Sequence, residues 1–213
     1  MKSIIPILFF IAFLHNANAQ VLKDSTSILQ MQAPDTFKAK FKTTQGDFII
    51  EVYKSWSPKA ADRLYQLITS GYYNNIVVYR ATAKYVQFGI SDQKAINSFW
   101  EGHAIADEPV LDSNKEGNIS FASAGPNTRT AQIFINMQNN LRLDTIHFMG
   151  GFGFPPVGKV IEGMDVVKKF NKQYGDDIAY NYQDSIYNSG NRYLIKNFPG
   201  LDVILSASIV DKQ

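Results

Sequence analysis

Hydrophobic and polar residues alternate along the chain from Phe37 to Tyr53, with Gln45 and Gly46 between two alternating stretches. Successive side chains of a β-strand point to opposite faces, so such alternation is typical of strands that bury one face. A Gly-containing interruption between two such runs favours a tight turn. The pattern therefore predicts a β-hairpin over residues 37 to 53.

The next segment changes to a helical spacing. Ser57 and Pro58 are residue types preferred at a helix N-cap and at the first helical position. Ala61 and Leu64 then begin an apolar series at helical spacing. We expect a helix from about residue 58 to 70, with an apolar stripe that covers another element.

Short β-like runs dominate the rest of the chain, separated by clusters of Gly, Asn, Asp and Pro. We expect them at about residues 76–80, 85–90, 118–123, 132–136 and 157–161, with a last strand at about 201–210. Further helices are expected from about residue 163 and over about 184–197. Many short strands with few helices favour a mainly β fold, a small closed antiparallel barrel, because closure removes exposed strand edges.

Residues 1–19 carry the features of a cleavable secretory signal peptide. Lys2 precedes an apolar run, and an Ala-x-Ala site ends at Ala19. An uncleaved membrane anchor is the alternative, but a membrane span needs roughly 20 apolar residues. The run here is shorter and is followed by Asn16 and Asn18. We therefore expect an exported protein, either periplasmic or secreted.

The chain after this signal divides into two parts. Residues 20–36 are mixed and polar with no clear period, which predicts a flexible N-terminal extension. Residues 37–213 contain no internal repeat and no linker, so we expect one folded domain. No heptad or broad apolar surface stripe appears, which favours a monomer with no stable membrane insertion once the signal is removed.

Composition excludes several kinds of chemistry. Lys plus Arg number 21 and Asp plus Glu 19, and the absence of a long like-charge run argues against a nucleic-acid partner. The chain has no Cys, which excludes disulfides and thiolate chemistry, and its three His are isolated, so we expect no metal and no cofactor. The acidic pairs Asp107-Glu108 and Asp176-Asp177 are typical of solvated turns rather than of an acid/base pair.

One ordered set of residues points to a specific chemistry. Arg80 ends one predicted strand, Gln87 lies in the next, and the segment FASAGPNT at 121–128 precedes Gln-Ile-Phe at 132–134. In this order the residues resemble the cyclophilin-type peptidyl-prolyl cis-trans isomerases, and the resemblance covers roughly residues 40–170. It implies a closed eight-stranded antiparallel barrel capped by two helices. The sequence adds a short helix near the C-terminus.

The resemblance also implies the residues of the site. Catalytic roles fall on Arg80, Gln87 and Phe134. Substrate-binding roles fall on Tyr85, Val86, Ala122, Ser123, Gln132, Leu143 and Phe154, and it stays open whether Tyr85 or Val86 lines the pocket. The implied partners are proline-containing polypeptides.

An arginine suits this reaction, which requires no proton transfer and no nucleophile. Rotation about an Xaa-Pro bond faces a barrier of about 18–20 kcal/mol because the C–N bond has partial double-bond character. In the twisted amide the proline nitrogen regains a lone pair, so a fixed guanidinium donor stabilises that state selectively. Arginine stays charged and carries its donors in one plane.

Three departures from the family pattern affect the site. The segment between Arg80 and Gln87 is one residue shorter than usual, so the loop at 81–84 must absorb the deletion or Gln87 turns away. Arg142 stands where the family usually has a tryptophan. An insertion at 145–153 is rich in glycine and is either a mobile flap beside the pocket or a surface loop.

Two functions remain open on these grounds. The first is an exported prolyl isomerase that assists the folding of other exported proteins. The alternative is a module on the same fold that binds proline-containing peptides without catalysis, or acts as a chaperone.

Overall fold

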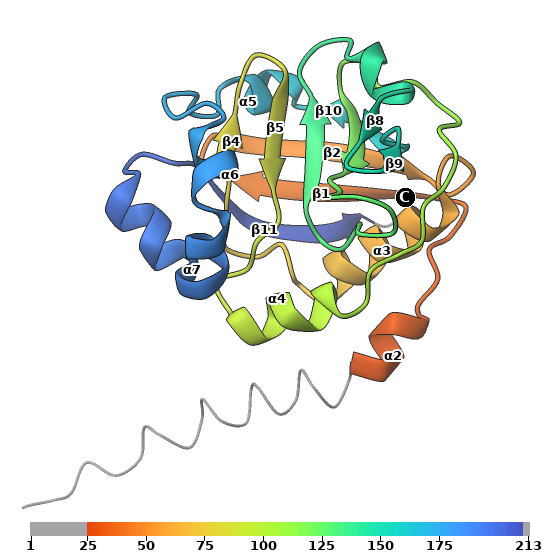
Figure 1. Ribbon diagram of the computed structural model, residues 1–213, viewed down its shortest axis with the longest axis horizontal. Helices are drawn as coiled ribbons and strands as arrows, with labels where there is room; N and C mark the ends of the chain where they lie inside the picture. Colours follow the sequence, from red (N-terminus) through yellow and green to blue (C-terminus); the bar gives the residue numbers. More distant parts are fainter. Residues whose placement is uncertain (1–24, 211–213) are drawn as a thin grey trace, which may run out of the picture. The chain divides into compact units, whose positions relative to one another are not determined.

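The computed structural model describes residues 25–210 (Figure 1). The chain divides into two units between residues 31 and 32. In the first unit, Ser25–Gln30 form helix α2. This helix falls within the predicted N-terminal extension, where no regular structure was expected. The predicted signal peptide at 1–19 lies outside the described residues.

The end of the predicted extension, from Gln32 onward, is part of the second unit. Ala33 is buried, and its backbone N–H donates to Asp62 Oδ1 at 2.8 Å. The Nζ of Lys54 donates to the Ala33 carbonyl at 3.0 Å and pairs with Asp62 at 2.9 Å. The ordered fold therefore includes residues that the sequence pattern assigned to the extension.

One antiparallel sheet dominates residues 32–210. Its order is β3-β11-β1-β2-β10-β6-β7-β5-β4. The strands are β1 (Thr36–Thr43), β2 (Gly46–Tyr53), β3 (Ile76–Val77), β4 (Arg80–Ala81), β5 (Tyr85–Phe88), β6 (Asn118–Phe121), β7 (Ile133–Asn136), β10 (Pro156–Glu162) and β11 (Val203–Val210). The mainly β fold is thereby confirmed, and each predicted strand has its counterpart.

The sheet has nine strands in this part of the chain, where eight were expected. The difference lies in the segment 76–81, which supplies β3 at one end of the sheet and β4 at the other. Only Val78 and Tyr79 separate the two strands. The curled sheet is thus joined end to end by one short stretch of chain.

The predicted hairpin of β1 and β2 is confirmed and supplies much of the core. Phe41 and Phe48 are register partners, and their rings stack with centroids 4.9 Å apart. Ala39, Ile50 and Val52 on the same face are fully buried. Alternation along both strands therefore has the predicted meaning, one face inside and one toward solvent.

Helices cover the sheet and connect its strands. They are α3 (Pro58–Thr69), α4 (Lys94–Glu101), the 3-10 helix η1 (Leu141–Asp144), α5 (Met164–Lys168), α6 (Asp177–Asn181) and α7 (Gln183–Asn197). Helices α3, α5 and α7 were predicted, whereas α4 and α6 were not. None of the helices within residues 25–210 is long and apolar enough to cross a membrane.

Helix α3 is capped by a residue that the sequence placed in a solvated turn. The backbone N–H groups of Lys59 and Ala60 donate to the Glu108 carboxylate at 2.7 and 3.2 Å. Ser57 donates its hydroxyl to the same carboxylate at 2.5 Å, and Arg129 pairs with it at 3.0 Å. The expectation for Glu108 was wrong because the free N–H groups of a first helical turn and a buried arginine both favour a carboxylate.

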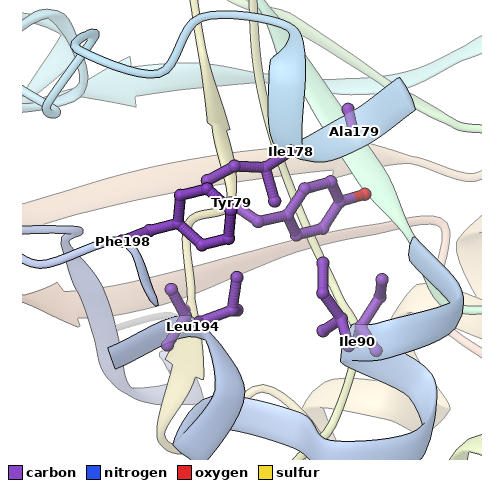
Figure 2. Close-up of a cluster of buried hydrophobic side chains, with 8 residues drawn as sticks. Tyr79, Ile90, Ile178, Ala179, Leu194 and Phe198 are labelled. Atoms are coloured by element: carbon purple, nitrogen blue, oxygen red, sulfur yellow. The ribbon is translucent and has the colours of Figure 1, made fainter. Parts of the chain in front are cut away.

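Helices α6 and α7 pack on the sheet through a cluster of buried apolar side chains (Figure 2). Its members are Val77, Tyr79, Ile90, Ile178, Ala179, Ile186, Leu194 and Phe198. Helix α7 is kinked at Gly190, whose φ of +58° suits glycine. A Cβ there would lie 2.2 Å from Asp92 Oδ1, so glycine permits this close approach.

Candidate active site

A cavity of about 340 Å³ opens beside the β4–β5 hairpin and α6. Eight of the residues predicted for the site line it: Arg80, Tyr85, Gln87, Ala122, Ser123, Phe134, Leu143 and Phe154. The lining also includes residues that the sequence did not assign: Ala124, Arg142, Ile146, Phe148, Met149, Ala179, Tyr180 and Gln183. The predicted residues therefore meet in one place, although they are far apart along the chain.

The strand register sets the predicted catalytic residues in a row. Gln87 of β5 is opposite Arg80 of β4 on one side and opposite Phe134 of β7 on the other. Directly opposed residues of antiparallel strands place their side chains on the same face. Pairing alone thus brings a guanidinium, an amide and an apolar ring together.

Val86 does not line the cavity, which corrects its predicted role. It is fully buried and pairs with Ala81 and Ile135, which are buried as well. Because adjacent residues of a strand face opposite sides, Tyr85 takes the pocket side and Val86 the core side. The alternative that the sequence left open is settled in favour of Tyr85.

The shortened loop between Arg80 and Gln87 keeps both side chains on the site. The Thr82 N–H donates to the Tyr85 carbonyl at 2.8 Å, and the Tyr85 N–H donates to Thr82 Oγ1 at 2.9 Å. This tight turn absorbs the missing residue. Arg80 and Gln87 are register partners, and Arg80 Nη1 donates to Gln87 Oε1 at 2.9 Å.

The Arg80 guanidinium is held from several sides. Its Cζ lies 5.0 Å from the ring centroid of Tyr85 and 5.4 Å from that of Tyr180. Its Nε donates to Asp176 Oδ1 at 2.6 Å, and its Nη2 is 3.4 Å from the Tyr180 hydroxyl. The side chain is only 14% exposed, so these contacts restrict a group that would otherwise be flexible.

A chain of amide and hydroxyl contacts orients Gln87. Its Nε2 donates to Gln132 Oε1 at 3.1 Å, and the Tyr79 hydroxyl donates to the same oxygen. Gln132 Nε2 donates to the Tyr187 hydroxyl at 2.7 Å. These partners fix which end of each amide is oxygen, and so turn Gln87 Oε1 toward Arg80. Gln132 therefore stands behind the cavity instead of lining it as predicted.

Tyr79 and Tyr187, the two tyrosines that contact Gln132, keep their protons at neutral pH. Burial raises the pKa of Tyr187 to about 12 and raises the pKa of Tyr79 well above its ordinary value. Each hydroxyl can therefore donate as well as accept. The contacts around Gln132 persist across the physiological pH range.

The floor of the cavity is apolar. Phe134 is nearly buried, and its ring meets those of Tyr85 and Phe154 edge-on, with centroids 5.6 and 5.8 Å away. Leu143 adds an aliphatic wall. An apolar floor suits a ring without an N–H donor, such as that of proline. The fixed guanidinium beside it can donate a hydrogen bond to the ring nitrogen.

Helix α6 and its N-cap residue supply contacts that sequence reasoning missed. Asp176 lies in a turn with its side chain 48% exposed, as expected, but its carboxylate also pairs with Arg80, which was not. Tyr180 lines the cavity and flanks the same guanidinium. Asp176 and Arg80 are 96 positions apart, and no local spacing or motif signals a contact over that distance.

No group of three or more His, Cys, Asp or Glu side chains in residues 25–210 could hold a metal ion. His147, the histidine of the insertion, packs its ring 5.0 Å from Phe152.

Comparison with known proteins gives the family. Residues 38–190 match the family described as cyclophilin type peptidyl-prolyl cis-trans isomerase. The chain belongs to this family of cofactor-independent isomerases. A peptidyl-prolyl cis-trans isomerase-like 1 from Rhizopus delemar is 30% identical over 68% of this chain and 87% of its own length. Its counterpart from Emericella nidulans is 33% identical over 62% of this chain and 83% of its own length.

Solved structures share the fold. A cyclophilin-type isomerase from Cryptosporidium parvum superposes with a TM-score of 0.59 at 21% identity, covering 84% of this chain and 99% of that one. A second structure of that protein, determined in the presence of the dipeptide Ala-Pro, gives a TM-score of 0.58, also at 21% identity, over 82% of this chain and 99% of that one.

Proposed function

We propose that this protein accelerates cis-trans isomerisation at Xaa-Pro bonds of exported polypeptides and so assists their folding. The observation that carries the proposal is the position of Arg80, fixed by Gln87 beside an apolar floor formed by Phe134. A prolyl ring on that floor presents its nitrogen to the guanidinium. Family membership supports the reaction, and the sequence features of residues 1–19 support export to the periplasm or beyond.

The reaction needs only binding and a positioned donor. As the amide twists, conjugation is lost and the proline nitrogen becomes a hydrogen-bond acceptor. An Nη–H of Arg80 donates to that nitrogen, most strongly in the twisted state. Ala122 and Ser123 line the cavity, where they can hold the peptide while one side of the bond rotates. No covalent bond forms or breaks.

A second candidate is a module that binds proline-containing peptides with little turnover. One observation favours it: the insertion places Phe148 and Met149 in the lining, which adds apolar binding surface that takes no part in the reaction. The two candidates differ in rate, not in affinity. Both predict peptide binding in this cavity, but only the isomerase accelerates exchange.

The test is NMR exchange spectroscopy on a short Ala-Pro-Phe peptide, with the purified protein and its Arg80→Ala variant side by side. We expect the wild type to accelerate exchange and the variant to lose most of that effect with its fold intact. If neither accelerates exchange while peptide resonances shift on titration, the binding module is the better account. Export is tested separately by N-terminal sequencing of the exported protein, which should begin at Gln20.

A further inference from the structure

We propose that Asp176 is a positioning residue for Arg80, holding the guanidinium so that its terminal nitrogens face the prolyl nitrogen of the substrate. The inference rests on the proposed isomerase function. It assigns a part in the reaction to the chain segment between α5 and β11, which the sequence pattern left without a role.

The contact lies at a position where it can orient the donor without replacing the substrate. A guanidinium has five N–H groups, one on Nε and two on each terminal nitrogen. Asp176 takes the Nε–H at 2.6 Å, and Gln87 takes one Nη1–H at 2.9 Å. The long contact to Tyr180 uses at most one Nη2–H. One N–H on each terminal nitrogen is left for the peptide.

Two bonds on two different nitrogens fix the plane of the guanidinium. Gln87 alone would leave the group free to swing about its Nη1 contact. With Asp176 on Nε, rotation in the plane is blocked, and the rings of Tyr85 and Tyr180 limit tilting out of it. An arginine fixed in this way loses little freedom when the twisted amide forms, which favours the transition state.

The carboxylate comes from an element that is packed on the sheet. Ile178 and Ala179, which follow it in α6, are buried in the cluster with Tyr79. Tyr79, which Figure 2 shows beside Ile178, is the chain neighbour of Arg80, so one apolar cluster anchors the segments that carry both partners of the ion pair. The Asp176 carbonyl also accepts from the Tyr180 N–H at 3.1 Å, which fixes the start of the helix.

The opposite effect, an inhibitory clamp, would require Asp176 to draw Arg80 away from the site. The geometry argues against it, because the Gln87 contact and the Asp176 contact are formed together. Arg80 also still lines the cavity. The two effects predict opposite changes in rate, so one experiment separates them.

The experiment measures exchange in the Ala-Pro-Phe peptide with Asp176→Asn, Asp176→Glu and Asp177→Asn variants of the protein. Asp177 is the matched control, because it is adjacent, carries the same charge, and its carboxylate accepts from Asn181 Nδ2 within α6 at 2.7 Å. We expect Asp176→Asn to lower kcat about tenfold with KM changed less than about twofold. Asp176→Glu should recover most of the rate, and Asp177→Asn should match the wild type.

A spectroscopic readout separates positioning from a general loss of structure. The Arg80 Nε–H resonance should shift in Asp176→Asn, while the backbone amide spectrum of the sheet stays in place. A rate in Asp176→Asn equal to or above that of the wild type overturns the proposal, and so does an equal loss in Asp177→Asn. If the wild type does not accelerate exchange, the proposed function is wrong. If the wild type is active and Asp176→Asn is equally active, the function stands and only the role of Asp176 is wrong.

Discussion

The cavity has two walls of different origin. One wall consists of sheet residues, with Arg80, Gln87 and Phe134 in a row across β4, β5 and β7. The other consists of α6 and the short β8 (His147–Phe148) and β9 (Gly151–Phe152) hairpin of the insertion. The sheet wall holds the groups to which we assign the reaction. In the second wall, Tyr180 of α6 and the preceding Asp176 contact Arg80, and Phe148 of the hairpin packs near Phe154.

The comparison teaches how differently the two walls are specified. In the sheet wall, register fixes which residues are opposed, so a preserved order of residues along the chain is enough to rebuild the site. In the second wall, Asp176 reaches Arg80 only because α6 is packed in the cluster around Tyr79. The first wall follows from local pattern, and the second depends on tertiary packing.

The largest effect should come from changing the donor itself in the sheet wall. Arg80→Lys keeps the charge but removes the planar set of N–H groups, so we expect the isomerisation rate to fall about 100-fold or more. Exchange spectroscopy on the peptide measures it. Arg192→Lys, a matched change at an exposed position of α7, should have no effect. Retention of most activity in Arg80→Lys would show that charge alone suffices.

The packing that holds α6 and α7 on the sheet can be weakened by a substitution at a residue that does not line the cavity. Leu194 of α7 is buried in the cluster that packs this helix on the sheet. Leu194→Ala should lower the free energy of local unfolding of α6 and α7 by at least about 2 kcal/mol. Hydrogen exchange of their amides should accelerate while that of β1 and β2 stays slow. Ile195→Ala, next to it but 65% exposed, is the control and should change little. Equal acceleration in the sheet would mean that the walls unfold as one unit.

The sequence predicted the features that depend on local pattern and missed those that depend on tertiary packing. Strands and the α3 helix were predictable because their apolar positions recur at a fixed period along one face. Helices α4 and α6, of eight and five residues, were missed although the five-residue α5 was predicted, because short helices depend on tertiary contacts and leave only one or two turns of periodic signal. Likewise eight of the predicted site residues meet in the cavity, whereas Val86 faces the core.

The missed site residues share one physical feature. Asp176 and Tyr180 reach the guanidinium across a contact between segments far apart in the chain, and Tyr187 reaches it through Gln132 and Gln87. A single sequence carries no local signal for such contacts. An adjacent pair of acidic residues in a turn looks the same in the sequence whether or not an arginine lies beside it, which is why the Asp176–Arg80 pair was missed.

An intermediate effect should come from the far end of the amide chain. Tyr187→Phe removes the acceptor for Gln132 Nε2, which lets that amide turn and weakens the hold on Gln87. We expect a two- to fivefold loss of kcat, about the value of one buried hydrogen bond. Because the pKa of Tyr187 is raised to about 12, the loss should be the same at pH 6 and pH 8.

Tyr193→Phe provides the control for this variant. Tyr193 lies on the same helix and packs its ring near Tyr182 and Phe198, away from Gln132. The substitution removes the same hydroxyl from α7 without touching the amide chain. A similar loss of kcat in both variants would trace the effect to helix stability and not to the orientation of Gln87.

The smallest effect should come from the hairpin of the insertion, and it decides between a flap that contributes to binding and a plain surface loop. Phe148 lines the cavity with its ring 6.0 Å from that of Phe154, whereas Phe152 on the facing strand packs against His147 outside the lining. Phe148→Ser should raise KM for the peptide about twofold with kcat unchanged, because it removes half-buried apolar surface and no donor. Phe152→Ser is the matched change and should leave KM at the wild-type value. If KM in Phe148→Ser is the same as in Phe152→Ser, the hairpin is a surface loop that does not contribute to binding. Helix α6 is then the only part of the second wall that affects the site.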